Sequence, residues 1–278
     1  MIDRRGAARS GPVLGLAALL GGWLPSDAAS VAPPASPVAT IAAPSRALAP
    51  LAGDDAMVPL VVSPFRDAMV SVPVGATEPR PVVVALHGNY DRPEWQCEVW
   101  RAVTRAVPFV LCPRGIPRPD APPPLDRWTY GKSADVRREV EAGLSALGQR
   151  FGEHVAPGPI LYAGFSLGAI VGVGIVSDQA ARFPRAVLIE GGHSQWTRER
   201  AQAFASAGGR VLFACGQPSC KSEVTAPKTL LSRAGAAVHV VYGDERAHTY
   251  DGKVADAISP ELGWLTEGDP RWAPLAKP

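Results

Sequence analysis

The sequence has almost no net charge, and this limits the partners that it can have. Its 278 residues include 28 Lys and Arg against 26 Asp and Glu, a formal net charge of +2. A strongly basic face for nucleic acid and a long acidic tail are therefore both missing. We expect no nucleic-acid partner, and the charge pattern points to no other macromolecule.

Motifs for phosphates and metals are absent as well. The chain has no HExxH segment, typical of zinc proteases, and no GxxxxGK loop, which cradles phosphates. Its four cysteines lack CxxC spacing, and no histidine stands at ligand spacing beside them, so a zinc site is disfavoured. The sequence therefore predicts neither a cofactor nor a metal ion.

No hydrophobic run is long enough for a stable membrane span. The apolar run at residues 12–24 follows three arginines and precedes small residues around Ser26 and Ala28, a pattern typical of a secretory signal peptide at 1–28. Residues 29–52 are mostly Ala, Pro and Ser, which predicts a disordered linker. We expect an exported protein, periplasmic or extracellular, with its folded domain at 53–278.

Export would place the cysteines in an oxidising compartment, where pairs form disulfides. Cys97 follows one predicted strand and Cys112 ends the next, while Cys215 and Cys220 bracket a short loop. We therefore expect the pairs Cys97–Cys112 and Cys215–Cys220. The alternative is that some of these residues are buried thiols.

Short β-branched runs alternate with amphipathic stretches of helical length, which predicts an α/β fold with a mostly parallel sheet and helices on both faces. Runs 58–62 and 68–74 should form an antiparallel edge, and the unbroken apolar run 82–86 suits a central strand. Further strands are expected at 109–112, 160–163, 186–189, 211–214 and 238–242, and helices at 135–151, 167–177, 197–207 and 226–234. The Pro-rich stretch 113–132 has no periodicity and should cross the surface above the strand ends.

The segment Gly164-Phe165-Ser166-Leu167-Gly168 fits a GxSxG motif between a predicted strand and a predicted helix. A serine needs a base to remove its proton and a sharp turn to expose its oxygen, and the two glycines let neighbouring backbone approach that turn. We therefore predict Ser166 as a nucleophile. The structural alternative is a tight turn with Ser166 as a helix cap.

Together with the run Val82-Val83-Val84-Ala85-Leu86-His87-Gly88 and a later histidine, this segment resembles the α/β-hydrolase superfamily, in particular bacterial predicted esterases, over about residues 58–266. The resemblance implies the α/β-hydrolase fold. It also implies an oxyanion hole built from the backbone N–H of Asn89 or Tyr90 and that of Leu167. Since His87 precedes the nucleophile in a family ordered Ser, acid, His, it should shape its loop and not act as the base.

Three histidines follow Ser166. His239 lies inside an apolar strand and His193 in the turn after another, whereas His248 follows the last strand and precedes an apolar helical segment. The position of His248 is that of the general base in the resembled family. We therefore predict His248 as the base, with a surface-loop histidine as the alternative.

The acid departs from the family pattern. Most relatives carry an aspartate about three residues after a glycine in the loop after the seventh strand, but here Gln217, Pro218 and Ser219 follow the glycine. Glu190 directly follows the preceding strand, and a charge there needs a partner, so we favour it as the acid. Glu223 and Asp244 remain open alternatives.

These residues predict a secreted serine hydrolase that acts on carboxylic esters through a Ser-His-acid triad and an acyl-enzyme. A peptidase or amidase of the same fold and a non-catalytic hydrolase-like binding domain are the alternatives. The expected partner is a small-molecule ester or amide. The sequence does not indicate the acyl chain, the choice between ester and amide, or the oligomeric state.

Overall fold

The computed structural model describes residues 47–244 and 246–275. The signal peptide predicted at 1–28 and most of the linker predicted at 29–52 lie outside these residues. The described end of the linker segment contacts the domain: the Leu48 and Leu51 amides donate to the carbonyls of Thr77 and Ala76 at 2.9 Å, and the Leu51 side chain is buried. Domain contacts therefore begin before residue 52, because apolar Leu51 is withdrawn from water.

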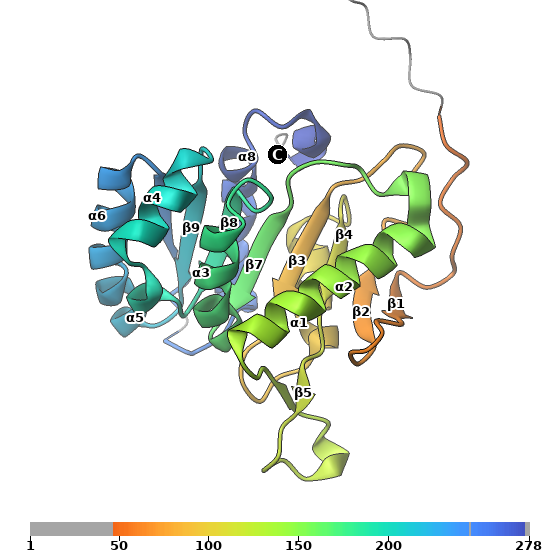
Figure 1. Cartoon of the computed structure of the whole chain (residues 1–278), viewed down its shortest axis with the longest axis horizontal. Coiled ribbons are helices and arrows are strands. Elements are labelled where there is room, and N and C mark those ends of the chain that lie inside the picture. The colour runs from red at the N-terminus through yellow and green to blue at the C-terminus, as the bar shows by residue number, and fades with distance from the viewer. Residues whose placement is uncertain (1–46, 245, 276–278) are drawn as a thin grey trace, which may run out of the picture. The chain divides into compact units, whose positions relative to one another are not determined.

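An eight-stranded sheet forms the centre of the domain (Figure 1), with the strand order β1-β2-β4-β3-β7-β8-β9-β10. The predicted antiparallel edge is confirmed, since β1 pairs antiparallel with β2 and β2 with β4, and all other pairs are parallel. The strands are β1 Met57–Leu60, β2 Ala68–Ser71, β3 Val82–Leu86, β4 Phe109–Cys112, β7 Leu161–Phe165, β8 Arg185–Ile189, β9 Arg210–Cys215 and β10 Ala237–Tyr242.

Helices cover both faces of this sheet, as the sequence predicts. Helices α2, α3, α4 and α6 pack on one apolar layer, and α1, α7 and α8 pack on the other. The α-helices are α1 Pro93–Val103, α2 Ser133–Phe151, α3 Leu167–Asp178, α4 Arg198–Ser206, α5 Pro218–Glu223, α6 Thr225–Ala234, α7 Gly252–Ile258 and α8 Leu262–Leu265. Single 3-10 turns lie at Pro123–Leu125, Gly152–His154, His193–Gln195, Ser259–Glu261 and Pro270–Leu275. Across the part of the chain that the structure describes, no helix combines the length and the apolar character needed to cross a bilayer.

Helix α1 is absent from the sequence prediction. Its buried residues Pro93, Gln96, Cys97, Trp100 and Val103 do recur at helical spacing. However, a proline, a glutamine and a cysteine make up most of that face, so the apolar signal is weak. The proline fits because it occupies the first turn, where a helix needs no N–H from it.

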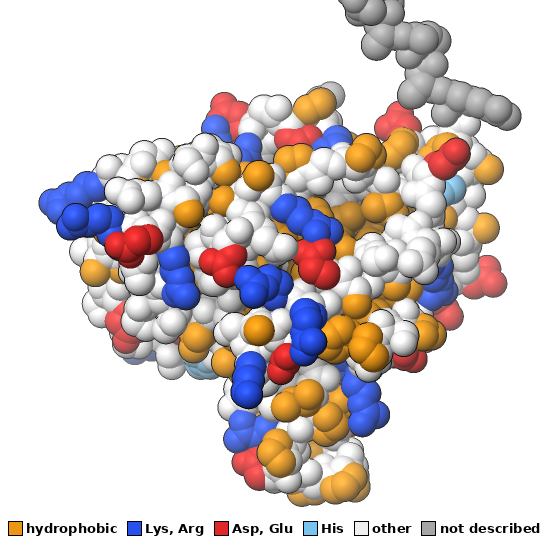
Figure 2. Space-filling model, in the orientation of Figure 1, with side chains coloured by type: hydrophobic (Ala, Val, Ile, Leu, Met, Phe, Trp, Pro, Cys, Tyr) orange, Lys and Arg blue, Asp and Glu red, His pale blue; other side chains and the backbone are white. Residues whose placement is uncertain are grey.

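Residues 113–132 form a projecting hairpin, although the sequence predicts only an irregular surface crossing. Its strands β5 Ile116–Pro117 and β6 Trp128–Thr129 are antiparallel and too short to produce a period in the sequence. The hairpin extends away from the body (Figure 1), and hydrophobic side chains gather on it between cationic ones (Figure 2). A bridge between Asp91 and Trp128 joins it to the loop after β3.

Both predicted disulfides are confirmed. Cys97 on α1 is bonded to Cys112 at the end of β4, with 5.9 Å between their Cα atoms. Cys215 at the end of β9 is bonded to Cys220 on α5, with 5.6 Å between Cα atoms. The second crosslink lies in the loop where the resembled family would carry its acid.

Candidate active site

Ser166 occupies a strained turn between β7 and α3. Its backbone has φ 50° and ψ −110°, in a region that non-glycine residues adopt at a cost. Ser166 stands at the N-cap position of α3, but its side chain makes no capping hydrogen bond, so the alternative of a helix cap is not supported. The hydroxyl is therefore left available for chemistry.

The glycines around this turn permit close backbone contacts. A Cβ at Gly164 would lie 2.6 Å from the carbonyl oxygen of Gly168, and a Cβ at Gly168 would overlap the carbonyl oxygen of Leu86. Gly191, just after β8, is similarly restricted, since a Cβ there would lie 2.6 Å from the Ser166 carbonyl. Only glycine fits these positions, which explains the spacing of the motif.

His248 lies in the loop between β10 and α7, beside the turn that carries Ser166. Its ring centroid is 4.9 Å from that of Phe165, the residue before the serine. Its Nδ1 atom is 3.4 Å from Oε2 of Glu190, and 46% of its side chain is exposed. No hydrogen bond between His248 and the Ser166 hydroxyl is present among the described residues. Such bonds often tighten only when substrate is bound.

Glu190 is a buried carboxylate directly after β8, at φ 51° and with 2% of its side chain exposed. Its Oε1 atom accepts hydrogen bonds from the backbone amides of Gly216 and Gln217, the latter at 2.8 Å. Burial by itself would raise the pKa of this carboxyl, but the His248 contact and the two amides outweigh it and lower the pKa below the ordinary value. Glu190 is therefore held in its charged form, facing His248.

The other carboxylates considered for this role have different partners. Glu223 lies 3.1 Å from Nδ1 of His193, and Asp244 interacts with the hydroxyl of Tyr242. His239, on β10, pairs at 2.7 Å with Glu261 instead of facing the serine. The arrangement thus brings Glu190, and not Glu223 or Asp244, to His248.

His193 also lies next to Cys215 and Cys220, and these three side chains are close enough to be considered as metal ligands. The two sulfur atoms are bonded to each other, so neither offers the thiolate that zinc requires. The cluster is therefore explained by the disulfide.

Asn89 and Tyr90, the two candidates for the oxyanion hole in the loop after β3, differ in whether their backbone N–H is already hydrogen-bonded. The Tyr90 amide donates to the Trp128 carbonyl at 3.0 Å and is thus occupied. None of the described hydrogen bonds uses the Asn89 amide. Leu167 is the first residue of α3, where an N–H has no acceptor within the helix. The geometry therefore favours Asn89 over Tyr90 as the partner of Leu167.

Asp91 is a buried residue of this region that sequence reasoning missed. Its carboxylate accepts hydrogen bonds from the Gly88 amide and from the Tyr250 hydroxyl, both at 3.2 Å. It thereby joins the loop after β3 to the loop that carries His248. A single aspartate in a loop has no pattern that could reveal this role.

His87 has the structural role that the sequence predicts. The side chain is fully buried, stacks on Tyr130 with 4.4 Å between ring centroids, and contacts the Arg114 carbonyl through Nε2 at 3.0 Å. Burial lowers its pKa. The residue supports the turn that presents Asn89.

No protein-family model and no curated protein sequence matches the chain. Solved structures do match its fold. Fluorophosphonate-binding serine hydrolase F of Staphylococcus aureus matches with a TM-score of 0.55, covering 77% of this chain and 100% of that one at 14% identity. A carboxylesterase from Mesorhizobium loti matches with a TM-score of 0.52, over 75% and 99% of the two chains at 18% identity. Protein TT1662 from Thermus thermophilus matches with a TM-score of 0.54, over 76% and 98% at 15% identity. At these identities the likeness concerns the fold, and it confirms the predicted α/β-hydrolase fold.

Proposed function

We propose that this chain, which has the α/β-hydrolase fold, is an exported serine hydrolase that cleaves carboxylic esters. Ser166 is the nucleophile, His248 the base, Glu190 the acid, and the Asn89 and Leu167 amides form the oxyanion hole. The observation that carries the proposal is the buried Glu190 carboxylate, fixed by two backbone amides on one side and facing His248 on the other.

In the acylation step, Nε2 of His248 takes the Ser166 proton as Oγ attacks the ester carbonyl carbon. The carbonyl oxygen becomes an oxyanion, which accepts hydrogen bonds from the Asn89 and Leu167 amides. When it collapses, the C–O bond breaks and the leaving alcohol takes the proton from His248. Water then attacks the acyl-enzyme with the same base, releases the carboxylic acid and restores Ser166.

The surroundings of Ser166 suit the charges that form during the reaction, the oxyanion and the imidazolium. The positive end of the twelve-residue helix α3 lies at Ser166, where negative charge develops. Each fixed N–H donor at an oxyanion lowers the activation free energy by about 3 to 4 kcal/mol. Glu190, through Nδ1–H of His248, orients the ring and stabilises the imidazolium that forms between the two proton transfers.

Two further points support parts of the proposal. The choice of esters rests on the carboxylesterase and serine hydrolase among the structural matches. Export rests on the N-terminal sequence pattern and on two disulfides, which form in oxidising compartments. The non-catalytic alternative predicts a His248 that is far from Ser166 and has no carboxylate, and the contact with Glu190 argues against the second of these features.

A fluorophosphonate probe tests the proposal directly. The intact protein should gain the mass of one phosphonyl group, and peptide mapping should place it on Ser166, because the probe phosphonylates only activated serines. The Ser206→Ala variant, which changes an exposed serine on α4, should label at the parental rate. An unlabelled intact protein, or a label on another residue, would contradict the assignment.

The side chain of Asn89 is clamped by the projecting hairpin, and this leads to a second prediction. Its Oδ1 atom accepts hydrogen bonds from the Thr129 hydroxyl at 2.8 Å and from the Arg118 guanidinium. Thr129→Val removes one of these bonds and keeps the shape of the side chain. The clamp fixes the side chain of Asn89 and thereby orients the backbone N–H of the same residue. We therefore expect kcat to fall about tenfold with little change in KM.

Steady-state kinetics with an activated ester would measure this effect. Thr229→Val, on the exposed side of α6, is the matched control and should leave kcat unchanged. An unaltered kcat in Thr129→Val would show that the clamp does not position the donor.

A further inference from the structure

Strand β10 is the outer edge of the sheet. It pairs with β9 along six residues, and within the described residues no strand lies on its other side. The outer N–H and C=O groups of such a strand can pair with an added chain. Its side chains are only partly buried, so this edge is accessible.

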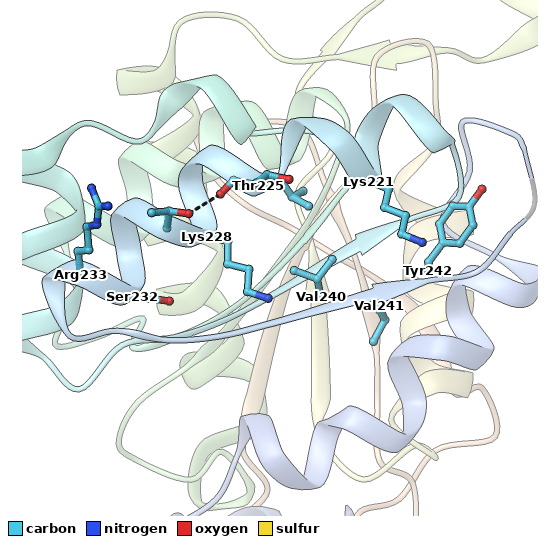
Figure 3. Close-up of a pocket in the computed structure, with 10 residues that line it drawn as sticks. Lys221, Thr225, Lys228, Ser232, Arg233, Val240, Val241 and Tyr242 are labelled. Carbon is cyan, nitrogen blue, oxygen red and sulfur yellow. Dashed lines mark hydrogen bonds between the residues drawn. The ribbon is translucent and has the colours of Figure 1, made fainter.

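A groove of about 850 Å³ runs between this edge and the helices α5 and α6 (Figure 3). Val224, Val240 and Tyr242 give it an apolar floor. None of the residues that we assign to the ester reaction lines it. The groove is therefore separate from the proposed active site.

The helical wall of the groove carries Lys221 on α5 and Lys228 on α6, with Thr225 and Ser232 beside them. Figure 3 shows Lys221 and Lys228 extending from the helices toward β10, and the Lys221 ammonium lies 4.9 Å from the Tyr242 ring centroid. Among the described residues, no carboxylate forms an ion pair with either lysine. The groove thus places two lysines, which have no carboxylate partner in the part of the chain that the structure describes, beside an unpaired strand edge.

We propose that this groove binds an extended acidic peptide segment, which adds to β10 as a further strand. Lys221 on α5 and Lys228 on α6 are seven positions apart in the sequence, and both line the groove. Residues on one face of a strand recur every 6.6 Å or so. Flexible lysine side chains can therefore reach carboxylates that stand two or four residues apart. The occupant is a strand with Asp or Glu at alternate positions.

Charge and proline content argue against two other occupants of the groove. A second copy paired through β10 about a two-fold axis would bring its own lysines to this edge, and like charges on adjacent strands repel. The N-terminal segment 29–46 contains four prolines, one arginine and no acidic residue. Its prolines cannot donate to a strand ladder.

Fluorescence anisotropy with a labelled ten-residue peptide of alternating glutamate and threonine tests the proposal. We expect saturable binding that weakens with salt, and much weaker binding of the glutamine analogue. The double variant Lys221→Gln/Lys228→Gln should weaken binding roughly tenfold, since each exposed ion pair contributes about two- to fivefold. Lys132→Gln, a lysine at the start of α2, is the matched control and should bind as the parent does.

Hydrogen exchange provides the second readout, because strand addition should slow the exchange of amides in Ala237–Tyr242 when the peptide is bound. Equal affinity for the glutamate and glutamine peptides, or an unaffected double variant, would overturn the proposal. So would binding without slower exchange in β10. Sedimentation of the protein alone showing a dimer with protected β10 amides would assign the edge to a second copy instead.

Discussion

Replacement of Ser166 by alanine is expected to lower kcat for an activated ester by about 10⁶-fold. The substitution removes the only atom that can form the acyl-enzyme and leaves the turn intact. The Ser166 amide donates to the Ile189 carbonyl at 2.8 Å with the backbone at φ 50°, and we expect alanine to keep both because neither involves the hydroxyl. Steady-state hydrolysis of a p-nitrophenyl ester measures the loss.

The fold of this variant should be unchanged, which separates loss of chemistry from loss of structure. The Ser166 side chain makes no capping hydrogen bond, so we expect the free energy of unfolding to change by less than about 1 kcal/mol. Urea denaturation of both proteins checks this. If a folded Ser166→Ala variant hydrolysed the ester at more than about 1% of the parental rate, Ser166 would not be the nucleophile.

The central strands could be predicted from the sequence because burial on both faces leaves a continuous apolar run. The predicted runs 82–86 and 109–112 coincide with β3 and β4, and every residue of both strands is buried. The turn at Ser166 was equally readable, since backbone contacts permit only glycine at two of its positions. Both features are encoded in contiguous residues: a run of apolar side chains for the strands, and the five-residue GxSxG spacing for the turn.

Features that depend on distant residues could not be predicted in this way. The choice between Asn89 and Tyr90 rests on the Trp128 carbonyl, which reaches Tyr90 only because a hairpin folds back onto the loop after β3. The role of Asp91 depends on Tyr250, which lies 159 residues further along the chain in another loop. No local period or motif encodes such pairings, because they form between segments without regular structure.

For the acid of the proposed triad, the structure selects among carboxylates that the sequence leaves open. The sequence leaves Glu190, Glu223 and Asp244 open, and the structure places Glu190 at His248, Glu223 at His193 and Asp244 at the Tyr242 hydroxyl. Glu190→Gln is therefore expected to lower kcat about 10⁴-fold. The glutamine can still accept from the Gly216 and Gln217 amides, but it places no negative charge against His248.

That loss of charge matters at two points of the cycle. The carboxylate favours the tautomer of His248 that carries its proton on Nδ1, which leaves Nε2 free to accept the serine proton, and it stabilises the imidazolium that follows. Because the pKa of Glu190 lies below its ordinary value of 4.5, the charge is present from neutral to mildly acidic pH. Glutamine supplies neither effect, whereas Glu223→Gln removes only the partner of His193 and should leave kcat within about twofold. Kinetics of the two variants at pH 7 compare the carboxylates directly. A larger loss in Glu223→Gln than in Glu190→Gln would move the acid to the loop after β9, where the resembled family carries it.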